Sequence, residues 1–188
     1  MKLILIRHGA TEANEKRLYC GSTDLPLSAS GAAALREKVL SGAYPCADGF
    51  RFVTSGLKRC AETLLAVYGA VAFTPEKRIS EMDFGVFEMK SYAELKDDPA
   101  YVAWISGDNE KNVAPGGESG EMMKERVFDW LSEAVSENAD TVAVTHGGVI
   151  AAIMDKLFAE EPKNRYEWQP VCGGGYVVDV EKHVYTAF

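Results

Sequence analysis

The sequence predicts an α/β fold, in which helices cover both faces of a sheet. Residues 3–6 and residues 141–144 are continuous apolar runs, too short for helices and rich in β-branched side chains, as expected of strands buried on both faces. Segments with helical periodicity lie between them in the chain. In folds of this class, ligands bind just beyond the carboxyl ends of the strands.

Both of these predicted strands end in a glycine turn that carries a histidine. Arg7 and His8 follow residues 3–6, and His146 follows residues 141–144. If the two strands are parallel neighbours, both imidazoles emerge at the same edge of the sheet. Arginine supplies a permanent cation for an oxyanion, and histidine can act as a nucleophile or a base. We therefore expect the active site at this edge.

The composition limits the classes of function. The length of 188 residues predicts one domain over residues 1–188. The net charge of −8 argues against nucleic acid as a partner, because phosphate backbones attract basic surfaces. No apolar run approaches the roughly 20 residues that a membrane helix needs, and no signal-peptide pattern opens the chain. We expect a cytoplasmic monomer or homodimer without a membrane partner.

The cysteines and histidines do not suggest a metal site. The four cysteines are scattered and form no C-x-x-C pair, and the three histidines show no metal-ligand spacing. Such scattered thiols usually stay reduced. We therefore expect no metal and no cofactor, packing roles for Cys20 and Cys60, and a surface position for His183.

The first half of the chain predicts two helices and a strand. Residues 29–40 read as a helix with a serine at the N-cap, and residues 50–54 as a strand. Ser55 is expected to cap an amphipathic helix at residues 57–68. Arg59 lies in the first turn of that helix, where the macrodipole disfavours a cation. An anion shared between Arg59 and the helix N-terminus would explain this position.

A lid over the active edge is predicted for residues 80–120. This segment has no clear buried-strand pattern, and long connections of this kind usually carry function. The other expected elements are a strand at 71–73, short helices at 91–95 and 98–104, helices at 118–138 and 148–158, with Met122 among the residues facing the core, and a last strand at 175–180.

The side chains expected at the active edge suit a small dianion such as phosphate. Two guanidiniums, two imidazoles, an amide and the backbone N–H groups of glycine turns would surround it. One imidazole could attack phosphorus, and the other, protonated, could stabilise charge in the transition state. These groups belong to Arg7, His8, Asn14, Arg59, His146 and Gly147.

A carboxylic acid is also required, because an alkoxide leaving group needs a proton at neutral pH. Glu81 is the candidate, and Glu12, Asp83 and Glu88 remain alternatives. The alternative role for Asn14 is that of a loop cap.

The chain resembles the histidine phosphatase superfamily, the phosphoglycerate mutase-like proteins, in several motifs that occur in the family's order. They are RHGATEAN (7–14), SGLKRCAET (55–63), EMDFG (81–85), PGGES (115–119) and VTHGG (144–148). The resemblance implies a three-layer α/β/α sandwich with a mostly parallel sheet. It also implies His8 as the phosphorylated nucleophile, Glu81 as the proton donor, and a phosphate pocket of Arg7, Asn14, Arg59 and His146.

Residues 18–28 and 84–104 look most like the α-ribazole-5′-phosphate phosphatases, which act in cobalamin synthesis. The similar cofactor-dependent mutases carry an arginine pair before Gly-Glu-Ser, where this chain has Pro115 and Gly116. Hydrolysis is therefore favoured over transfer. The resemblance implies a metal-independent phosphomonoesterase acting on a small phosphorylated metabolite, with α-ribazole 5′-phosphate as the candidate. The alternatives are a mutase and a non-catalytic protein that binds a phosphorylated metabolite.

Overall fold

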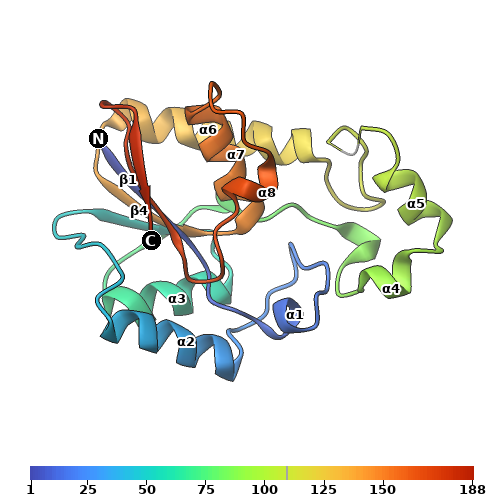
Figure 1. Ribbon diagram of the computed structural model, residues 1–188, viewed down its shortest axis with the longest axis horizontal. Helices are drawn as coiled ribbons and strands as arrows, with labels where there is room; N and C mark the ends of the chain where they lie inside the picture. Colours follow the sequence, from blue (N-terminus) through green and yellow to red (C-terminus); the bar gives the residue numbers. More distant parts are fainter. Residues whose placement is uncertain (109) are drawn as a thin grey trace.

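Two parallel strands form the middle of a six-stranded sheet in a computed structural model, which describes residues 1–108 and 110–188 (Figure 1). They are β1 (Lys2–Arg7) and β4 (Thr141–Thr145), paired from Leu3 opposite Thr141 to Arg7 opposite Thr145. This pairing confirms the prediction that the two strands are parallel neighbours. The strand order is β3-β2-β4-β1-β5-β6, with β2 (Arg51–Thr54), β3 (Thr74–Pro75), β5 (Gly175–Asp179) and β6 (Val184–Ala187).

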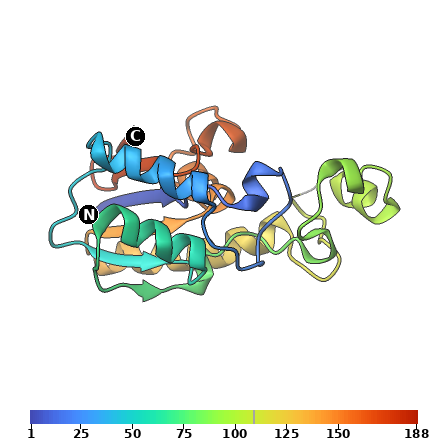
Figure 2. The ribbon, with the colours of Figure 1, turned by 90° about the horizontal axis from the view of Figure 1, so that it is seen from below.

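The sheet is mostly parallel and lies between two layers of helices, which confirms the predicted fold class. The strands β2, β3 and β4 run parallel to β1, and β5 runs antiparallel to it. The helices α2 (Ala29–Leu40) and α3 (Lys58–Tyr68) cover one face, and α6 (Gly120–Glu137) and α7 (Gly147–Leu157) cover the other (Figures 1 and 2).

Side chains of β1 alternate between the two cores, because successive residues of a strand point to opposite faces. Leu3 and Leu5 belong to the cluster that contains the buried residues of α6 and α7. Ile4 and Ile6 belong to the cluster on the side of α3, with Cys60. Both faces of β1 are thus buried, and this explains why its sequence is a continuous apolar run rather than an alternating one.

Several predicted details are wrong. The strand expected at 71–73 is found at Thr74–Pro75, where it pairs with β2. The N-cap of α3 is Leu57, so Ser55 does not cap that helix. On α6, Met122 is 45% exposed and the adjacent Met123 is 1% exposed, so Met123 and not Met122 faces the core at the start of the helix. The last strand is β6, which pairs antiparallel with β5.

The segment expected to be a lid extends to one side of the sheet (Figures 1 and 2). Of its described residues, 80–108 and 110–120, none lies in a strand. Its two helices, α4 (Tyr92–Leu95) and α5 (Pro99–Ile105), begin at N-caps whose side chains accept backbone N–H groups, Ser91 and Asp98. Contacts among aromatic rings hold it against residues 16–28, here called the first loop. Tyr19 of this loop packs tilted on Phe84 and edge-to-face on Tyr101 and Trp104.

The remaining short helical elements are α1 (Glu12–Glu15), η1 (Lys77–Ile79), η2 (Gly85–Phe87) and α8 (Arg165–Trp168). Within the described part of the chain, no helix combines the length and the apolarity that a membrane span requires.

Candidate active site

His8 stands directly beyond the end of β1 in a buried position, 5% exposed. Its backbone N–H donates to the carbonyl of Thr145 at 2.9 Å, which ties the turn to β4. The ring atom Nδ1 lies 2.7 Å from the carbonyl oxygen of Gly9. A carbonyl only accepts, so Nδ1 carries the proton and Nε2 keeps its lone pair. His8 is thus held in the tautomer that a nucleophile requires.

His146 follows β4, is fully buried, and lies beside His8 with ring centroids 5.1 Å apart. Its Nε2 lies 2.9 Å from the hydroxyl oxygen of Ser55. Its Nδ1 lies 3.4 Å from Nη2 of Arg59, a group that only donates. The hydrogen-bond pattern thus places the proton of His146 on Nε2 and turns Nδ1 towards the guanidinium.

Arg59 occupies the first turn of α3, as predicted, and is 1% exposed. Its Nη1 donates to the carbonyl of Thr23 and its Nη2 to the carbonyl of Gly21, both at 2.7 Å. A buried cation is costly unless hydrogen bonds compensate it. The first loop therefore holds the guanidinium beside the two imidazoles instead of leaving it on the surface.

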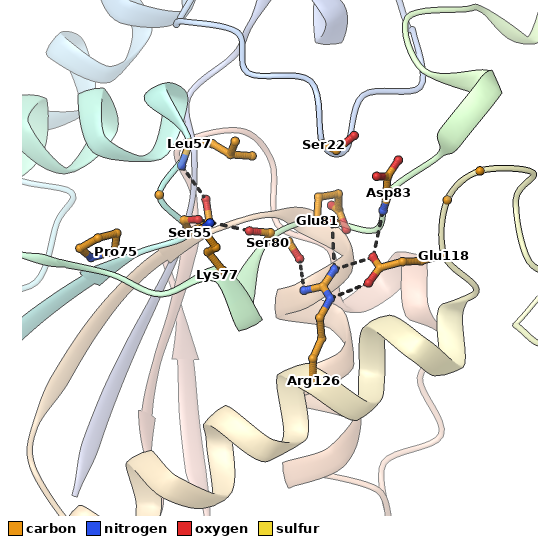
Figure 3. A pocket seen from close by; sticks show the side chains of 13 residues that line it. Ser22, Ser55, Leu57, Pro75, Lys77, Ser80, Glu81, Asp83, Glu118 and Arg126 are labelled. Carbon is orange, nitrogen blue, oxygen red and sulfur yellow. Dashed lines mark hydrogen bonds and ion pairs between the residues drawn. The ribbon is translucent and has the colours of Figure 1, made fainter.

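Glu81 points its carboxylate at the start of α7. Its Oε2 accepts from the N–H of Gly148 at 3.0 Å, and its Oε1 from the N–H of Met82 at 3.1 Å. A Cβ at Gly148 would lie 2.5 Å from Oε1, so only glycine permits this approach. Arg126 of α6 donates to the backbone carbonyl of Glu81 at 3.0 Å and pairs with Glu118 (Figure 3). These contacts hold the backbone at Glu81 in place.

The three alternative carboxylates are otherwise engaged. Glu12 is exposed and pairs with Lys16 on the surface. Asp83 accepts the N–H of Gly85 at 2.8 Å. Glu88 accepts backbone N–H groups of the first loop with both oxygens. Glu81 also accepts backbone N–H groups, but of the four carboxylates it is the one that lines a cavity together with Arg7 and Asn14, and this favours it.

Arg7 and Asn14 meet Glu81 along the wall of one cavity. Arg7 donates through Nη1 to the carbonyl of Pro170 at 2.8 Å, and its buried Nε has no partner among the described residues. Asn14 accepts from the N–H of Thr11 at 2.9 Å and so caps its loop, which is the alternative role that the sequence suggested for it. It also lines the cavity, so the two roles are compatible. Gly147, the first residue of α7, would bring a Cβ within 3.2 Å of the Arg7 guanidinium carbon.

Two cavities adjoin the carboxylate of Glu81. The one with Arg7 and Asn14 has a volume of about 500 Å³, and its outer wall is made of Tyr19, Phe84, Tyr101, Trp104 and Arg165. The other, of about 640 Å³, extends towards β3 and is lined by Ser55, Lys77 and Arg126, among others (Figure 3). The first cavity is lined by two of the predicted phosphate ligands, Arg7 and Asn14, and the second by none of them, so we expect the substrate in the first. His8, Arg59, His146 and Gly147 line neither cavity. Among the residues that line the larger cavity, only Ser55 forms a hydrogen bond with one of the two imidazoles, that of His146.

Burial and neighbouring cations keep both imidazoles neutral. Desolvation, followed by the charge of Arg59, lowers the pKa of His8 to about 3. Desolvation, followed by the charges of His8 and Arg59, lowers the pKa of His146 well below 6.5. A neutral His8 suits a nucleophile. The protonated imidazole expected in the transition state stays a prediction, because the lowered pKa of His146 belongs to the protein on its own, in which the ring is buried against a guanidinium.

Comparison with known proteins places this geometry in a family. The family model "histidine phosphatase superfamily (branch 1)" matches residues 3–184. The chain belongs to this superfamily. The adenosylcobalamin/α-ribazole phosphatase of Salmonella typhimurium strain LT2 is 29% identical, with 96% of this chain and 91% of the relative covered. The chain is therefore an enzyme of the histidine phosphatase type, as predicted.

Two solved structures share the fold of this histidine phosphatase. One, from Escherichia coli K-12 and assigned to an α-ribazole-5′-P phosphatase, has a TM-score of 0.85 at 23% identity and covers 100% of this chain and 94% of its own. At that identity it shows the fold alone. The phosphoglycerate mutase of Thermus thermophilus has a TM-score of 0.74 at 31% identity, with 95% of this chain and 93% of its own covered.

The lowered pKa values make the histidine phosphatase less stable in acid. Unfolded His8 has a pKa near 6.5 and binds a proton that the folded ring binds only near pH 3, so the unfolded state takes up more protons between these values. We expect the free energy of unfolding to fall by about 1.4 kcal/mol per pH unit for His8 as the pH drops through this window, and His146 to add to the fall. Urea unfolding at several pH values measures this.

The matched comparison is His8→Asn, which removes the titrating ring at the same site. This variant should lose about 1.4 kcal/mol per pH unit of that dependence. An unchanged slope would contradict a neutral buried His8. The surface residue His183, exposed and paired with Glu160, offers a control whose replacement should leave most of the slope in place.

Sequence reasoning missed several residues of the site. Ser55 forms a hydrogen bond with His146. Glu88 supports the loop around Arg59, and Arg126 supports the segment around Glu81. The rings of Tyr101 and Trp104 form part of the cavity wall. Their motifs show that they lie near the site, but not which atoms they contact. Among residues 1–108 and 110–188, no group of three or more His, Cys, Asp and Glu side chains could hold a metal ion.

Proposed function

We propose that this histidine phosphatase hydrolyses phosphomonoesters without a metal, through a phosphohistidine at His8. The observation that carries the proposal is the pair of buried imidazoles, with ring centroids 5.1 Å apart, beside the buried guanidinium of Arg59. Cations and imidazoles supply the positive charge that a transferring phosphoryl group requires. Arg7, Asn14 and the N–H of Gly147 complete the proposed phosphate pocket.

In the proposed first step, Nε2 of His8 attacks phosphorus, and the bond from phosphorus to the ester oxygen breaks. Glu81, as the carboxylic acid, gives its proton to that oxygen. In the second step the Glu81 carboxylate takes a proton from water, whose oxygen attacks phosphorus and frees His8 together with inorganic phosphate. The arriving dianion offsets the charge of Arg59 and so favours protonation of His146 in the complex.

The outer wall of the 500 Å³ cavity supports a leaving group with a flat, apolar part. Tyr19, Phe84 and Trp104 line this wall in mutual ring contact, and aromatic rings of this kind pack well against a planar base. The Salmonella typhimurium relative is named for α-ribazole, a ribosylated aromatic base. We therefore propose α-ribazole 5′-phosphate as the substrate and cobalamin synthesis as the process.

Phosphate release from a panel of phosphomonoesters in EDTA tests this function. The panel contains α-ribazole 5′-phosphate, 3-phosphoglycerate and p-nitrophenyl phosphate. We expect full activity with EDTA and the highest kcat/KM for α-ribazole 5′-phosphate. Equal, weak release from all substrates would keep the chemistry and reject the substrate. Loss of activity in EDTA would reject metal independence.

A mutase is the second candidate. The two residues before Gly117, Glu118 and Ser119 are Pro115 and Gly116 rather than an arginine pair, and this favours hydrolysis. However, Arg165 lines the substrate cavity and could hold a second anionic group. Faster transfer of the phosphoryl group between positions of 3-phosphoglycerate than to water would support the mutase. Tight binding of a phosphorylated metabolite without turnover would support the non-catalytic alternative.

A cytoplasmic location and a single domain with residues 80–120 as its lid also belong to this proposal. The four cysteines are free thiols, and this supports a reducing compartment. The aromatic contacts between the first loop and residues 84–104 support a lid built onto the same domain. The state of assembly, monomer or homodimer, stays a prediction.

A further inference from the structure

The first loop has no regular secondary structure where it reaches Arg59. Residues 21–24 are bends and unassigned backbone, yet the carbonyls of Gly21 and Thr23 are the acceptors that orient the guanidinium. The direction of these two carbonyls therefore depends on whatever fixes the loop from outside. The group that does so controls the position of Arg59.

The carboxylate of Glu88 is that group. Its Oε1 accepts the N–H of Gly21 at 2.8 Å and of Ser22 at 3.1 Å. Its Oε2 accepts the N–H of Thr23 at 3.2 Å and the Thr23 hydroxyl at 2.6 Å. A peptide unit joins the carbonyl of one residue to the N–H of the next, and the two point in opposite directions. Holding the N–H of Ser22 therefore turns the carbonyl of Gly21 away from Glu88 and towards Arg59. The bonds to the N–H and the hydroxyl of Thr23 fix the residue whose own carbonyl Arg59 also contacts.

Glu88 is itself anchored from the lid side. It follows η2, in which Phe87 is fully buried, and its Oε1 also accepts the N–H of Phe84 at 3.1 Å. The loop lies so close to this segment that a Cβ at Gly21 would be 1.7 Å from the carbonyl oxygen of Met82. Glu88 thus joins the segment that follows Glu81 to the loop that holds Arg59.

We propose that Glu88 is a positioning residue, which acts on the phosphoryl group through the first loop and Arg59. The inference rests on the proposed role of Arg59 in holding that group. A carboxylate is needed because it offers only acceptors, whereas the –NH2 of an amide cannot accept from the loop N–H groups. A small displacement of a group that contacts the reacting centre can cost up to about 100-fold in rate.

A double-mutant cycle tests the proposal, with Glu88→Gln and Arg59→Lys singly and combined. The readouts are kcat/KM for p-nitrophenyl phosphate and the inhibition constant of inorganic phosphate. We expect Glu88→Gln alone to lower kcat/KM roughly 10- to 100-fold and to weaken phosphate inhibition. In the Arg59→Lys background the same change should cost less than about threefold, because the guanidinium that it positions is absent. Equal losses in both backgrounds would overturn the proposal.

The matched control is Glu94→Gln. Glu94 also accepts a backbone N–H and a hydroxyl, those of Ser91, but it caps α4 in the lid. It should leave phosphate inhibition unchanged. If Glu88→Gln does not fold, Thr23→Val removes only the hydroxyl contact and keeps the carbonyl, and it should give a smaller loss that also disappears with Arg59→Lys. Equal losses from Thr23→Val in both backgrounds would overturn the proposal in that case.

The same data separate this inference from the proposed function. If Arg59→Lys alone leaves both kcat/KM and phosphate inhibition unchanged, the phosphate role of Arg59 is wrong, and the inference falls with it. If Arg59→Lys is impaired but Glu88→Gln is not, or is equally harmful in both backgrounds, the phosphate site stands and only the positioning role of Glu88 is rejected.

Discussion

Replacing His8 with alanine should abolish phosphate release, with a fall of roughly 10⁴-fold or more in kcat. The loss follows from the geometry of the ring, whose Nε2 lone pair is made available by the bond from Nδ1 to the Gly9 carbonyl. Among the described residues, no other group at the site combines a free lone pair with this position beside Arg59 and His146. Phosphate release from the best substrate of the panel measures the effect.

The fold of His8→Ala should persist, because the β1–β4 pairing and the apolar cores do not depend on the ring. Circular dichroism and phosphate binding provide the check. The control is His183→Ala, whose site lies on the surface, and this variant should keep full activity. In the wild type, a rapidly quenched reaction should contain phosphorylated protein that is labile in acid and stable in alkali, as an N–P bond requires. An active His8→Ala protein would reject the mechanism.

Replacing Glu81 with glutamine should lower kcat for alkyl phosphates by roughly 10²- to 10⁴-fold. The amide keeps the shape of the side chain and one acceptor for the N–H of Gly148 or Met82, but it cannot deliver a proton to an alkoxide. The loss should appear mainly in kcat, since the phosphate ligands Arg7, Arg59 and His146 are unchanged. Steady-state kinetics on a sugar phosphate measure it.

The leaving group distinguishes proton donation from a structural role of Glu81. The p-nitrophenolate ion departs without a proton, so Glu81→Gln should form phosphohistidine from p-nitrophenyl phosphate and then hydrolyse it slowly. We expect a burst of nitrophenolate equal to the enzyme concentration. An equal loss for both substrates, without a burst, would contradict the proposed role. The exposed carboxylate of Glu12 supplies the control, and Glu12→Gln should behave as wild type.

The sequence alone determined the central strands and the edge at which the histidines meet. Residues 3–6 and 141–144 are buried on both faces, and such strands require continuous apolar runs, which are local and visible. Because parallel strands present their carboxyl ends at one edge, His8 and His146 could be placed side by side without coordinates. The order of the family motifs then supplied the superfamily.

Only the tertiary structure decided the hydrogen bonds and charge states. Ser55 looks like a helix cap in sequence, because a serine before an amphipathic segment usually is one, but it bonds to His146 instead. The neutral state of His146 follows from complete burial beside a guanidinium that is distant in the chain. The proposed positioning role of Glu88 depends on its bonds to the N–H groups of Gly21 and its neighbours. These N–H groups have no sequence signature, because every non-proline residue carries a backbone N–H. Local patterns determine strands and helices, whereas the direction of a backbone group in an irregular loop is set by contacts between distant segments.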